Sequence, residues 1–381
     1  MYKAPEFTVT QFWNPVKITF GADSLDRLPE ILATLPGRRV TLITGADLIE
    51  ALGILDHVRA LVGDRELSVY QGVDPNPEVE QAQRATDFAR EHGAEVILGI
   101  GGGSALDTAK IVAATIPNGG NVAAILNKEC TVSAASLPTI MVPTTAGTGS
   151  EVTRWGTLWE HEAKKKYSME GMTMYPTHAV LDPKLTLTLP PVFTAATGMD
   201  ALSHAMESYW SKNANPVSDA YALEAVRRIF EALPLVMNNP DNLEHRTRML
   251  FASLLAGLAF SNTKTGVAHS LSYPMTLNFG VIHGQASSIT LPGIMKFNAE
   301  VSLERMANLA KAVGGNSVDS GARRIQVLLQ RVGLKSSLSE LGIDADGIEV
   351  CVREGYTPDR AGHNLRDVDA DGLREVLQSV A

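Results

Sequence analysis

The chain has 381 residues, of which 45% are hydrophobic, and its 33 basic and 42 acidic residues give a net charge of −9. This composition excludes disordered and fibrous proteins, and the length predicts roughly two domains with full-sized cores. No apolar run reaches the ~18–20 residues of a membrane helix, and no basic tract offers a surface for nucleic acid.

The first residues and the cysteines further limit the class of protein to which the chain can belong. The first residues contain no basic segment followed by an apolar one, which argues against a secretory signal. Cys130 and Cys351 are too few and too far apart for a disulfide framework or a thiolate metal site. We therefore expect a soluble cytoplasmic enzyme that binds neither membrane nor nucleic acid.

The first half of the chain alternates short β-branched runs with amphipathic stretches. Strands are predicted over residues 16–20, 39–44, 67–70, 95–100 and 139–142. Helices are predicted between them over residues 23–35, 47–61, 79–90 and 105–113. This alternation is typical of a parallel sheet with helices on both faces.

The pattern changes near Pro190. Beyond it the sequence shows helical periodicity without a clear strand, for example over 248–260, 301–313 and 322–332. We predict an α/β domain over residues 1–190 and an all-α domain over residues 191–381.

Two glycine-containing loops follow predicted strands of the first domain. Gly99–Ser104 leads from one strand into a helix, so its backbone N–H groups and the helix dipole suit a phosphate. The run does not complete the GxGxxG fingerprint, and a tight turn without ligand is the alternative. Thr144–Ser150 follows a second strand, at the edge where open α/β sheets bind ligands. Together the loops favour a nucleotide site.

A second set of residues has the chemistry of a metal site. Asp200 and His204 are four residues apart in a helical stretch, which places a carboxylate and an imidazole on one face. His269 and His283 follow further along the chain. Any one of these histidines alone is more readily explained as an ordinary hydrogen-bonded residue. Three imidazoles and one carboxylate together suit Fe(II) or Zn(II) better than Mg(II) or Ca(II).

Five motifs follow one another along the chain: GGGSALDTAK, PTTAGTGSE, LDPKLTLTLPP, ATGMDALSHAMESY and the pair AHSLSYP and GVIHG. Together they resemble, over nearly the whole chain, the motifs of the iron-dependent (group III) alcohol dehydrogenases. The resemblance implies a Rossmann-like, dehydroquinate synthase-like domain that binds the dinucleotide and an all-α domain that binds the metal and carries catalysis. It also implies that the metal, expected to be Fe(II) with Zn possible, is held by Asp200, His204, His269 and His283.

The resemblance further assigns residues to the cofactor. It places Gly102, Gly103 and Ser104 at the pyrophosphate, with Asp107 nearby, and Thr144, Thr145, Thr148 and Ser150 on the phosphate–nicotinamide side. It places Lys166 at the ribose and Leu185 and Leu189 near the nicotinamide.

Two positions depart from the family's usual pattern. NAD-preferring members end the second strand with an acidic residue that holds the ribose 2′-OH, whereas this chain has Gly45 there, which favours NADP(H). Asp47, two residues on, would reverse this preference if its loop turned inward. Tyr273 stands where many relatives carry a further histidine. It is either a packing substitution or a phenol that relays a proton or orients substrate.

Two basic residues bear on the substrate. Arg154 follows the second loop, and Lys264 precedes His269 in TKTGVAHSLSYP, which resembles the branch that reduces phosphonoacetaldehyde to 2-hydroxyethylphosphonate. Such a pair would bind an anionic aldehyde through charge-assisted hydrogen bonds, unless both point to solvent or contact the cofactor phosphate.

The expected reaction is metal-dependent reduction of a small aldehyde by NADP(H) in preference to NAD(H). Alternatives are a general alcohol dehydrogenase of the butanol or 1,3-propanediol type, a zinc polyol dehydrogenase resembling glycerol dehydrogenase, and an enzyme for maleylacetate-like acids. A non-enzymatic nucleotide-binding regulatory module is a further alternative. The strand-like segment 12–20 suggests pairing in a homodimer or higher homo-oligomer.

Overall fold

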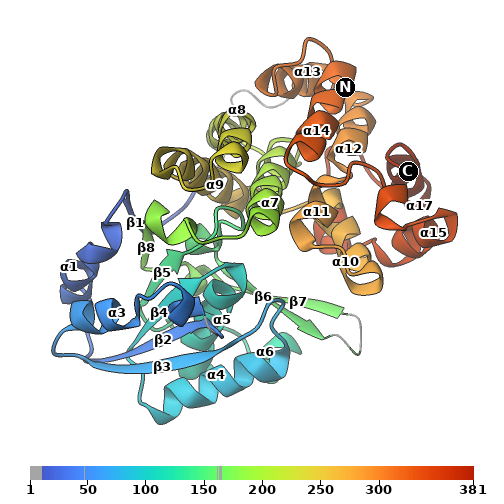
Figure 1. Cartoon of the computed structure of the whole chain (residues 1–381). Coiled ribbons are helices and arrows are strands. Elements are labelled where there is room, and N and C mark those ends of the chain that lie inside the picture. The colour runs from blue at the N-terminus through green and yellow to red at the C-terminus, as the bar shows by residue number, and fades with distance from the viewer. Residues whose placement is uncertain (1–10, 47, 161, 163–164) are drawn as a thin grey trace. The chain divides into compact units, whose positions relative to one another are not determined.

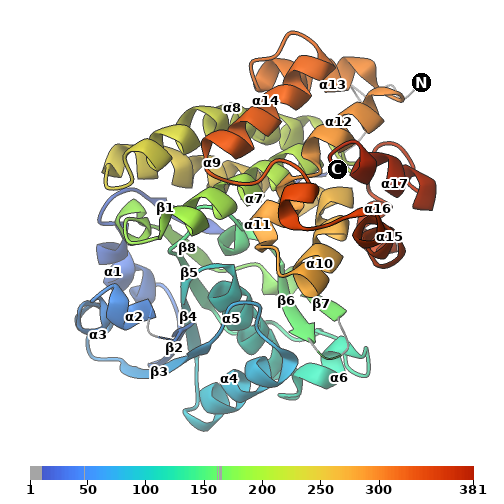
Figure 2. The same cartoon turned by 45° about the vertical axis from the view of Figure 1, so that its right-hand side comes forward.

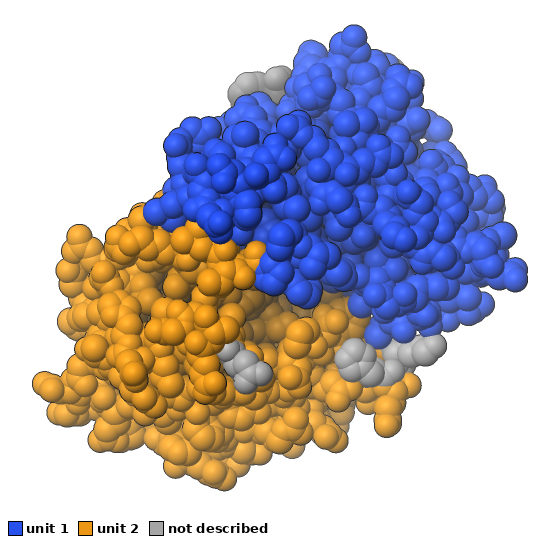
Figure 3. Space-filling model, viewed as in Figure 1, with its two compact units in different colours: residues 1–13, 146–148, 190–381 blue, residues 14–145, 149–189 orange. Residues whose placement is uncertain are grey.

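The structure is a computed structural model that describes residues 11–46, 48–160, 162 and 165–381 (Figure 1). The chain divides into two compact units, coloured separately in Figure 3. The α/β unit comprises residues 14–145 and 149–189. The helical unit comprises residues 11–13, 146–148 and 190–381.

The α/β unit contains a six-stranded sheet in which every pairing is parallel. Its strand order is β1 (Lys17–Phe20), β8 (His178–Leu181), β5 (Thr139–Pro143), β4 (Val96–Gly101), β2 (Arg39–Gly45) and β3 (Glu66–Val73). Five of the six match predicted strands. The prediction missed β8, a four-residue buried strand next to the edge strand β1.

Alternating side chains of the central strands fill two hydrophobic cores. Leu42 and Leu98 face the core that α1 (Leu28–Ala33) and α3 (Leu55–Val62) cover, whereas Ile43 and Ile97 face the core formed with α4 (Val79–Glu91) and α5 (Gly103–Thr115). Strands buried on both faces therefore carry continuous apolar runs, which is why the sequence pattern predicted them well.

A separate antiparallel hairpin was not predicted. It pairs β6 (Trp155–Glu160) with β7 (Lys165–Glu170), and their connection includes residues outside the described part of the chain. In β6 buried residues are interrupted by half-buried ones, and β7 carries three charged residues, so neither strand has the apolar runs of the main sheet.

Two predicted helices of this unit are interrupted. The segment predicted as a helix over 47–61 forms α2 (Leu48–Ala51) and α3, separated at Gly53, whose φ of +64° favours glycine. The segment 23–35 begins as a 3₁₀ turn, Ser24–Arg27, before α1. The short helix α6 (Val122–Leu126) packs beside α4.

The helical unit is built around three long helices that pack against one another: α7 (Pro191–Tyr209), α8 (Pro216–Asn238) and α9 (Leu243–Thr263) (Figure 2). The others are α10 (Val267–Phe279), α11 (His283–Ser288), α12 (Leu291–Ala299), α13 (Leu303–Ala312), α14 (Val318–Arg331), α15 (Ala345–Glu354), α16 (Pro358–Ala361) and α17 (Ala370–Gln378). The predicted fold class, a parallel α/β sheet followed by a helical half, is confirmed. Within the described residues no helix is long and apolar enough to cross a membrane.

Candidate metal centre and cofactor loops

Helix α7 presents Asp200, His204 and Glu207 at spacings of four and three residues, so all three lie on one face. Pro191 begins the helix, and the small residues around Asp200 allow close contact with α8, α9 and α11. All three polar side chains are buried. Burial of so many titratable groups on one helix face requires partners of opposite charge or a metal.

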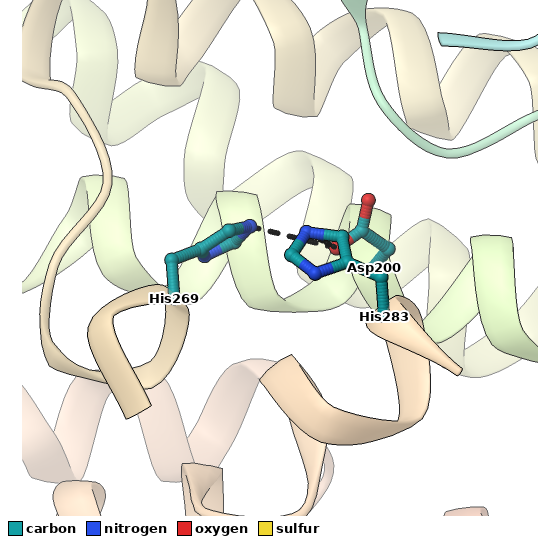
Figure 4. A group of neighbouring side chains, drawn as sticks. All are labelled: Asp200, His269 and His283. Atoms are coloured by element: carbon teal, nitrogen blue, oxygen red, sulfur yellow. Dashed lines mark ion pairs between the residues drawn. The ribbon is translucent and has the colours of Figure 1, made fainter. Parts of the chain in front are cut away.

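Three side chains from three helices meet at this face. Asp200 of α7, His269 of α10 and His283 of α11 offer ligand atoms that all lie within 4.8 Å of one another (Figure 4). His269 Nε2 is 3.5 Å and His283 Nε2 is 3.9 Å from Asp200 Oδ1. Ser287 Oγ donates a hydrogen bond to the same oxygen at 3.0 Å. One carboxylate and two imidazoles form a metal site of the type used by iron and zinc.

His204, the fourth predicted ligand, lies beside this group. Its Nδ1 is 3.8 Å from Asp200 Oδ2, and its ring stacks on those of His269 and Phe260 at 4.5 and 4.1 Å. His204 Nδ1 and His269 Nε2 are both buried, and neither has a hydrogen-bond partner among the residues that the structure describes. Buried nitrogen atoms that lack hydrogen-bond partners beside a carboxylate fit a bound cation, because such atoms are otherwise satisfied in native proteins.

Charge at the site favours an ionised Asp200 beside a neutral His204, whereas Glu207 and Asp200 raise the pKa of His269 against the effect of burial. Burial alone would raise the pKa of Asp200, but the neighbouring histidines, His204 first, hold it well below its usual range. Burial lowers the pKa of His204 to about 4, so its imidazole is neutral at pH 7. A neutral imidazole is the form that binds a metal.

Glu207 is a further residue of the candidate site, and the sequence reasoning missed it. Its carboxylate accepts hydrogen bonds from His269 Nδ1 at 2.5 Å and from the backbone N–H of Ala268 at 2.6 Å. The proton of His269 is thereby held on Nδ1, which leaves Nε2 facing Asp200. Burial would raise the pKa of Glu207, but His269 lowers it overall. The spacing of seven residues from Asp200 was the signal that could have identified it.

Tyr273 lies on α10 next to a metal ligand. Its ring is nearly parallel to that of His283, with 6.4 Å between centroids. Burial raises the pKa of the Tyr273 phenol to about 12, so it keeps its proton at neutral pH. The structure thus places Tyr273 beside the metal site. This is the position expected of a residue that replaces a histidine near the metal.

The predicted phosphate loop joins β4 to α5. Gly102 is the N-cap of α5 and Gly103 its first residue, so the free N–H groups of a 13-residue helix begin there. Gly101 has a φ of +153°, and a Cβ on it would lie 2.6 Å from Ala105 Cβ. Ser104 Oγ accepts a hydrogen bond from the backbone of Asn76. The close packing that only glycine permits here fits a dinucleotide phosphate.

Gly101→Ala should cost about 1–3 kcal/mol of unfolding free energy and weaken NAD(P)H binding, because the new methyl group displaces the start of α5. Urea unfolding and fluorescence titration with NADPH measure the two effects. Gly53→Ala is the control, since Gly53 also has positive φ but nothing lies within 4 Å of its added Cβ. Equal NADPH affinity in both variants would contradict the assignment of this loop.

A buried lysine organises the loop after β5. Lys110 Nζ donates to the carbonyl oxygen of Ser150 at 3.0 Å and to Thr153 Oγ1 at 3.1 Å, and lies 3.1 Å from Asp107 Oδ1. Asp107 also accepts hydrogen bonds from Ser150 Oγ at 2.5 Å and from the backbone of Thr157 at 2.9 Å. Asp107 and Ser150 were predicted at the cofactor; in the structure their side chains bond to each other.

Glu151 adds a second buried charge to this loop. Burial raises its pKa from the ordinary 4.5 to about 7, and the attraction of Lys110 offsets only part of that rise. A carboxyl group with a raised pKa stabilises the fold fully below pH 4.5. That contribution is lost as the pH rises through about 7, because the folded protein ionises less readily than the unfolded chain.

Glu151→Gln should therefore flatten the pH dependence of stability between pH 4.5 and 8, by up to roughly 3 kcal/mol. The free energy of unfolding, measured across that range for both proteins, gives the difference. Glu304→Gln, on an exposed face of α13, is the control. Parallel curves for wild type and Glu151→Gln would show that Glu151 is ionised at neutral pH in the folded protein.

The remaining predicted cofactor residues occupy varied positions. Gly45 ends β2, whereas Asp47 lies outside the described residues. The backbone N–H of Thr144 donates to Gly101, Thr145 follows it, and Thr148 belongs to the helical unit. Lys166 lies on β7 with its ammonium 4.7 Å from the Trp159 ring centroid, Leu185 packs in the core beside α1, and Leu189 follows it, half-buried.

The two predicted substrate cations differ in their surroundings. Arg154 donates two hydrogen bonds to Glu170 Oε1, at 2.9 and 3.1 Å, so its charge is paired. Lys264 caps α9 with a φ of +65° and begins the short loop that leads to His269.

Comparison with known proteins gives matches over almost the whole chain. Residues 15–183 match the family model for iron-containing alcohol dehydrogenase, and residues 194–381 match the C-terminal model of the Fe-containing alcohol dehydrogenase family. Long-chain-alcohol dehydrogenase 1 of Geobacillus thermodenitrificans is 35% identical over 359 residues, which cover 89% of this chain and 88% of that protein. NADPH-dependent butanol dehydrogenase of Clostridium saccharobutylicum is 30% identical, covering 97% of both chains.

A solved structure is similar over the same extent. Sulfoacetaldehyde reductase from Bifidobacterium kashiwanohense, in complex with NAD⁺, matches with a TM-score of 0.90 and 30% identity, over 98% of this chain and 99% of that one.

Proposed function

The chain belongs to the iron-containing alcohol dehydrogenase family, and from that premise we propose that it reduces a small anionic aldehyde, with phosphonoacetaldehyde as the specific candidate. It is a metal-dependent, NAD(P)-linked oxidoreductase that interconverts alcohols and aldehydes. Its domains, in this proposal, are a dinucleotide-binding domain over residues 1–190 and a metal-binding, catalytic domain over residues 191–381.

The proposal of an anionic substrate rests chiefly on the position of Lys264. This lysine begins the loop of three residues before α10, whose first turn carries the metal-site residue His269. A cation so close in the chain to the metal site suits an aldehyde with a negative group near its carbonyl. The similar sulfoacetaldehyde reductase acts, by its name, on an aldehyde of that kind. Arg154 is the weaker candidate because Glu170 already pairs with it.

Reduction adds a hydride to the carbonyl carbon and a proton to its oxygen. When bound, the metal ion polarises that oxygen as a Lewis acid and the reduced nicotinamide supplies the hydride. Asp200, His269 and His283 would hold the ion, and the buried, unbonded Nδ1 of His204 supports His204 as a fourth ligand. The protonated phenol of Tyr273 would donate a hydrogen bond that orients the substrate oxygen.

Cofactor preference, metal identity and assembly complete the proposal. Gly45 at the end of β2 presents no carboxylate that would repel a 2′-phosphate, which favours NADP(H). We take Fe(II) as the metal, with Zn(II) as the alternative that the same ligands accept. We also propose a homodimer, because β1 lies at an edge of the sheet where a second chain can add a strand.

The test is NADPH oxidation by Fe(II)-loaded protein with phosphonoacetaldehyde and with butanal, an uncharged aldehyde. We expect a kcat/KM at least about 10-fold higher for the phosphonate, since hydrogen bonds to charged groups contribute about 1.5–3 kcal/mol. NADH in parallel tests the cofactor preference, and reloading with Zn(II) tests the metal. Comparable rates on both aldehydes would indicate a general alcohol dehydrogenase instead.

A further inference from the structure

Arg360 is a half-buried cation that stands close to the metal site within the helical unit. It lies on α16, and its guanidinium carbon is 5.3 Å from the ring centroid of Tyr273. Its Nη1 donates a hydrogen bond of 2.6 Å to Thr265 Oγ1. Arg360 therefore bridges two separate segments, α10 and the loop that precedes it.

Both contacts of Arg360 adjoin metal-site residues. Tyr273 is stacked alongside His283, and Thr265 lies in the loop that begins at Lys264 and leads to His269. The guanidinium group has five N–H donors, and its described hydrogen bond uses only one nitrogen. The other donors are free to bind a planar or tetrahedral oxyanion in a bidentate manner.

The charge of Arg360 is uncompensated within the part of the chain that the structure describes. There, no carboxylate forms an ion pair with it, whereas two other arginines of the same unit that are at least partly buried, Arg305 and Arg366, do pair. Arg305 contacts Asp219, and Arg366 lies 3.2 Å from Glu300. An arginine that is half-buried without a counter-ion, and held in place by a hydrogen bond and an aromatic ring, is well suited to bind an anion.

We propose that Arg360 binds the anionic group of the substrate and so determines specificity for charged aldehydes. The inference rests on the proposed function in that it assigns the residue that recognises the anion. The ligand class is a small aldehyde bearing a phosphonate, sulfonate or carboxylate close to the carbonyl. Arg360 takes over the role expected of Arg154, whose guanidinium is paired with Glu170. Lys264 supplies a second cation on the same loop as Thr265.

The experiment compares wild type with Arg360→Ala, Arg360→Lys and Arg353→Ala in the Fe(II)-loaded full chain. For each protein, kcat and KM are measured for phosphonoacetaldehyde and for butanal. The KM for NADPH is also measured. In addition, ethylphosphonate, which is not reduced, is tested as a competitive inhibitor of butanal reduction. Arg353 is the control because it is an exposed arginine on α15 that pairs with Glu354.

We expect Arg360→Ala to raise KM for phosphonoacetaldehyde and to lower the ratio of the two kcat/KM values by about 10- to 100-fold. Inhibition by ethylphosphonate should weaken by a similar factor. Arg360→Lys should keep part of the preference because it retains the charge but not the bidentate geometry. Arg353→Ala should leave the ratio unchanged. A purely structural role would instead lower kcat/KM for both aldehydes equally, which would overturn the proposal.

The outcomes separate this inference from the proposed function. If wild type prefers the phosphonate and Arg360→Ala keeps that preference, the proposed function stands and the role of Arg360 is wrong. If wild type shows no preference but ethylphosphonate inhibits through Arg360, the anion site stands and the proposed substrate is wrong. If neither preference nor inhibition is seen, both are wrong. A raised KM for NADPH with an unchanged aldehyde ratio would assign Arg360 to the cofactor and overturn the proposal.

Discussion

Asp200→Ala should weaken metal binding by more than about 100-fold and abolish metal-dependent aldehyde reduction. Asp200 supplies the negative charge of the three-residue site, and both His269 Nε2 and His283 Nε2 lie within 4 Å of its Oδ1. Without it, a divalent cation would meet only neutral nitrogen donors. Mutation of residues that only hydrogen-bond to the metal ligands already lowers metal affinity by about 10–100-fold, so the loss of a ligand itself should lower it further.

The measurement for Asp200→Ala is metal content per chain after dialysis, with the dissociation constant obtained by competition with a chelator. Circular dichroism checks that the variant folds. Asp319→Ala is the matched control, because Asp319 is an exposed aspartate on α14 that pairs with Lys296 away from the site. If Asp200→Ala retained one tightly bound ion and normal turnover, the metal site would have to lie elsewhere.

The elements that the sequence predicted well are those with strong local signals. β2 and β4 are buried on both faces, so β4 is an unbroken apolar run and β2 is rich in β-branched residues, and α4 has clear amphipathic spacing. β8 is only four residues long and follows an irregular stretch, so it is too short for a periodic pattern to be detected in the sequence. The β6–β7 hairpin is stabilised by cross-strand pairs, such as Lys166 beside Trp159, which a local pattern does not reveal.

The metal site was predictable because its chemistry requires particular residue types. Asp200 and two of the three predicted histidines gather from three helices, although they span more than eighty residues of sequence. Residues that act through others lacked such a signal. Lys110 lies in an apolar helix, and the sequence alone would place its side chain at the surface. In the structure its ammonium group is buried, lies beside Asp107 and donates a hydrogen bond to the backbone carbonyl of Ser150.

Arg360 illustrates a different limit of sequence reasoning. The sequence around Arg360 contains no motif that indicates a ligand-binding residue. Its position depends on how α16 packs beside α10. The sequence therefore pointed to Arg154 and Lys264, which are close in the chain to recognised motifs. Tertiary structure is needed to show that Arg154 is paired and that Arg360 lies against Tyr273.

Glu207→Gln should weaken metal binding by about 10- to 100-fold while leaving the three metal-site side chains in place. Glu207 accepts hydrogen bonds from the protonated Nδ1 of His269 and from two backbone N–H groups at the start of α10. The amide that replaces it carries no negative charge, so it makes the His269 imidazole a weaker ligand. It also has one acceptor oxygen in place of two, which leaves a buried donor without a partner and should cost about 1–3 kcal/mol of stability.

The decisive comparison is between Glu207→Gln and Glu151→Gln. Both remove a buried carboxyl group, but Glu151 belongs to the α/β unit, whereas all three metal-site residues belong to the helical unit. Chelator competition should show weaker Fe(II) or Zn(II) binding for Glu207→Gln alone, and excess metal should restore much of its kcat. Because added metal repairs occupancy but not a misfolded site, that rescue distinguishes an effect on ligand strength from general damage. Equal metal affinity in the two variants would mean that His269 needs no partner at Nδ1 to bind the ion.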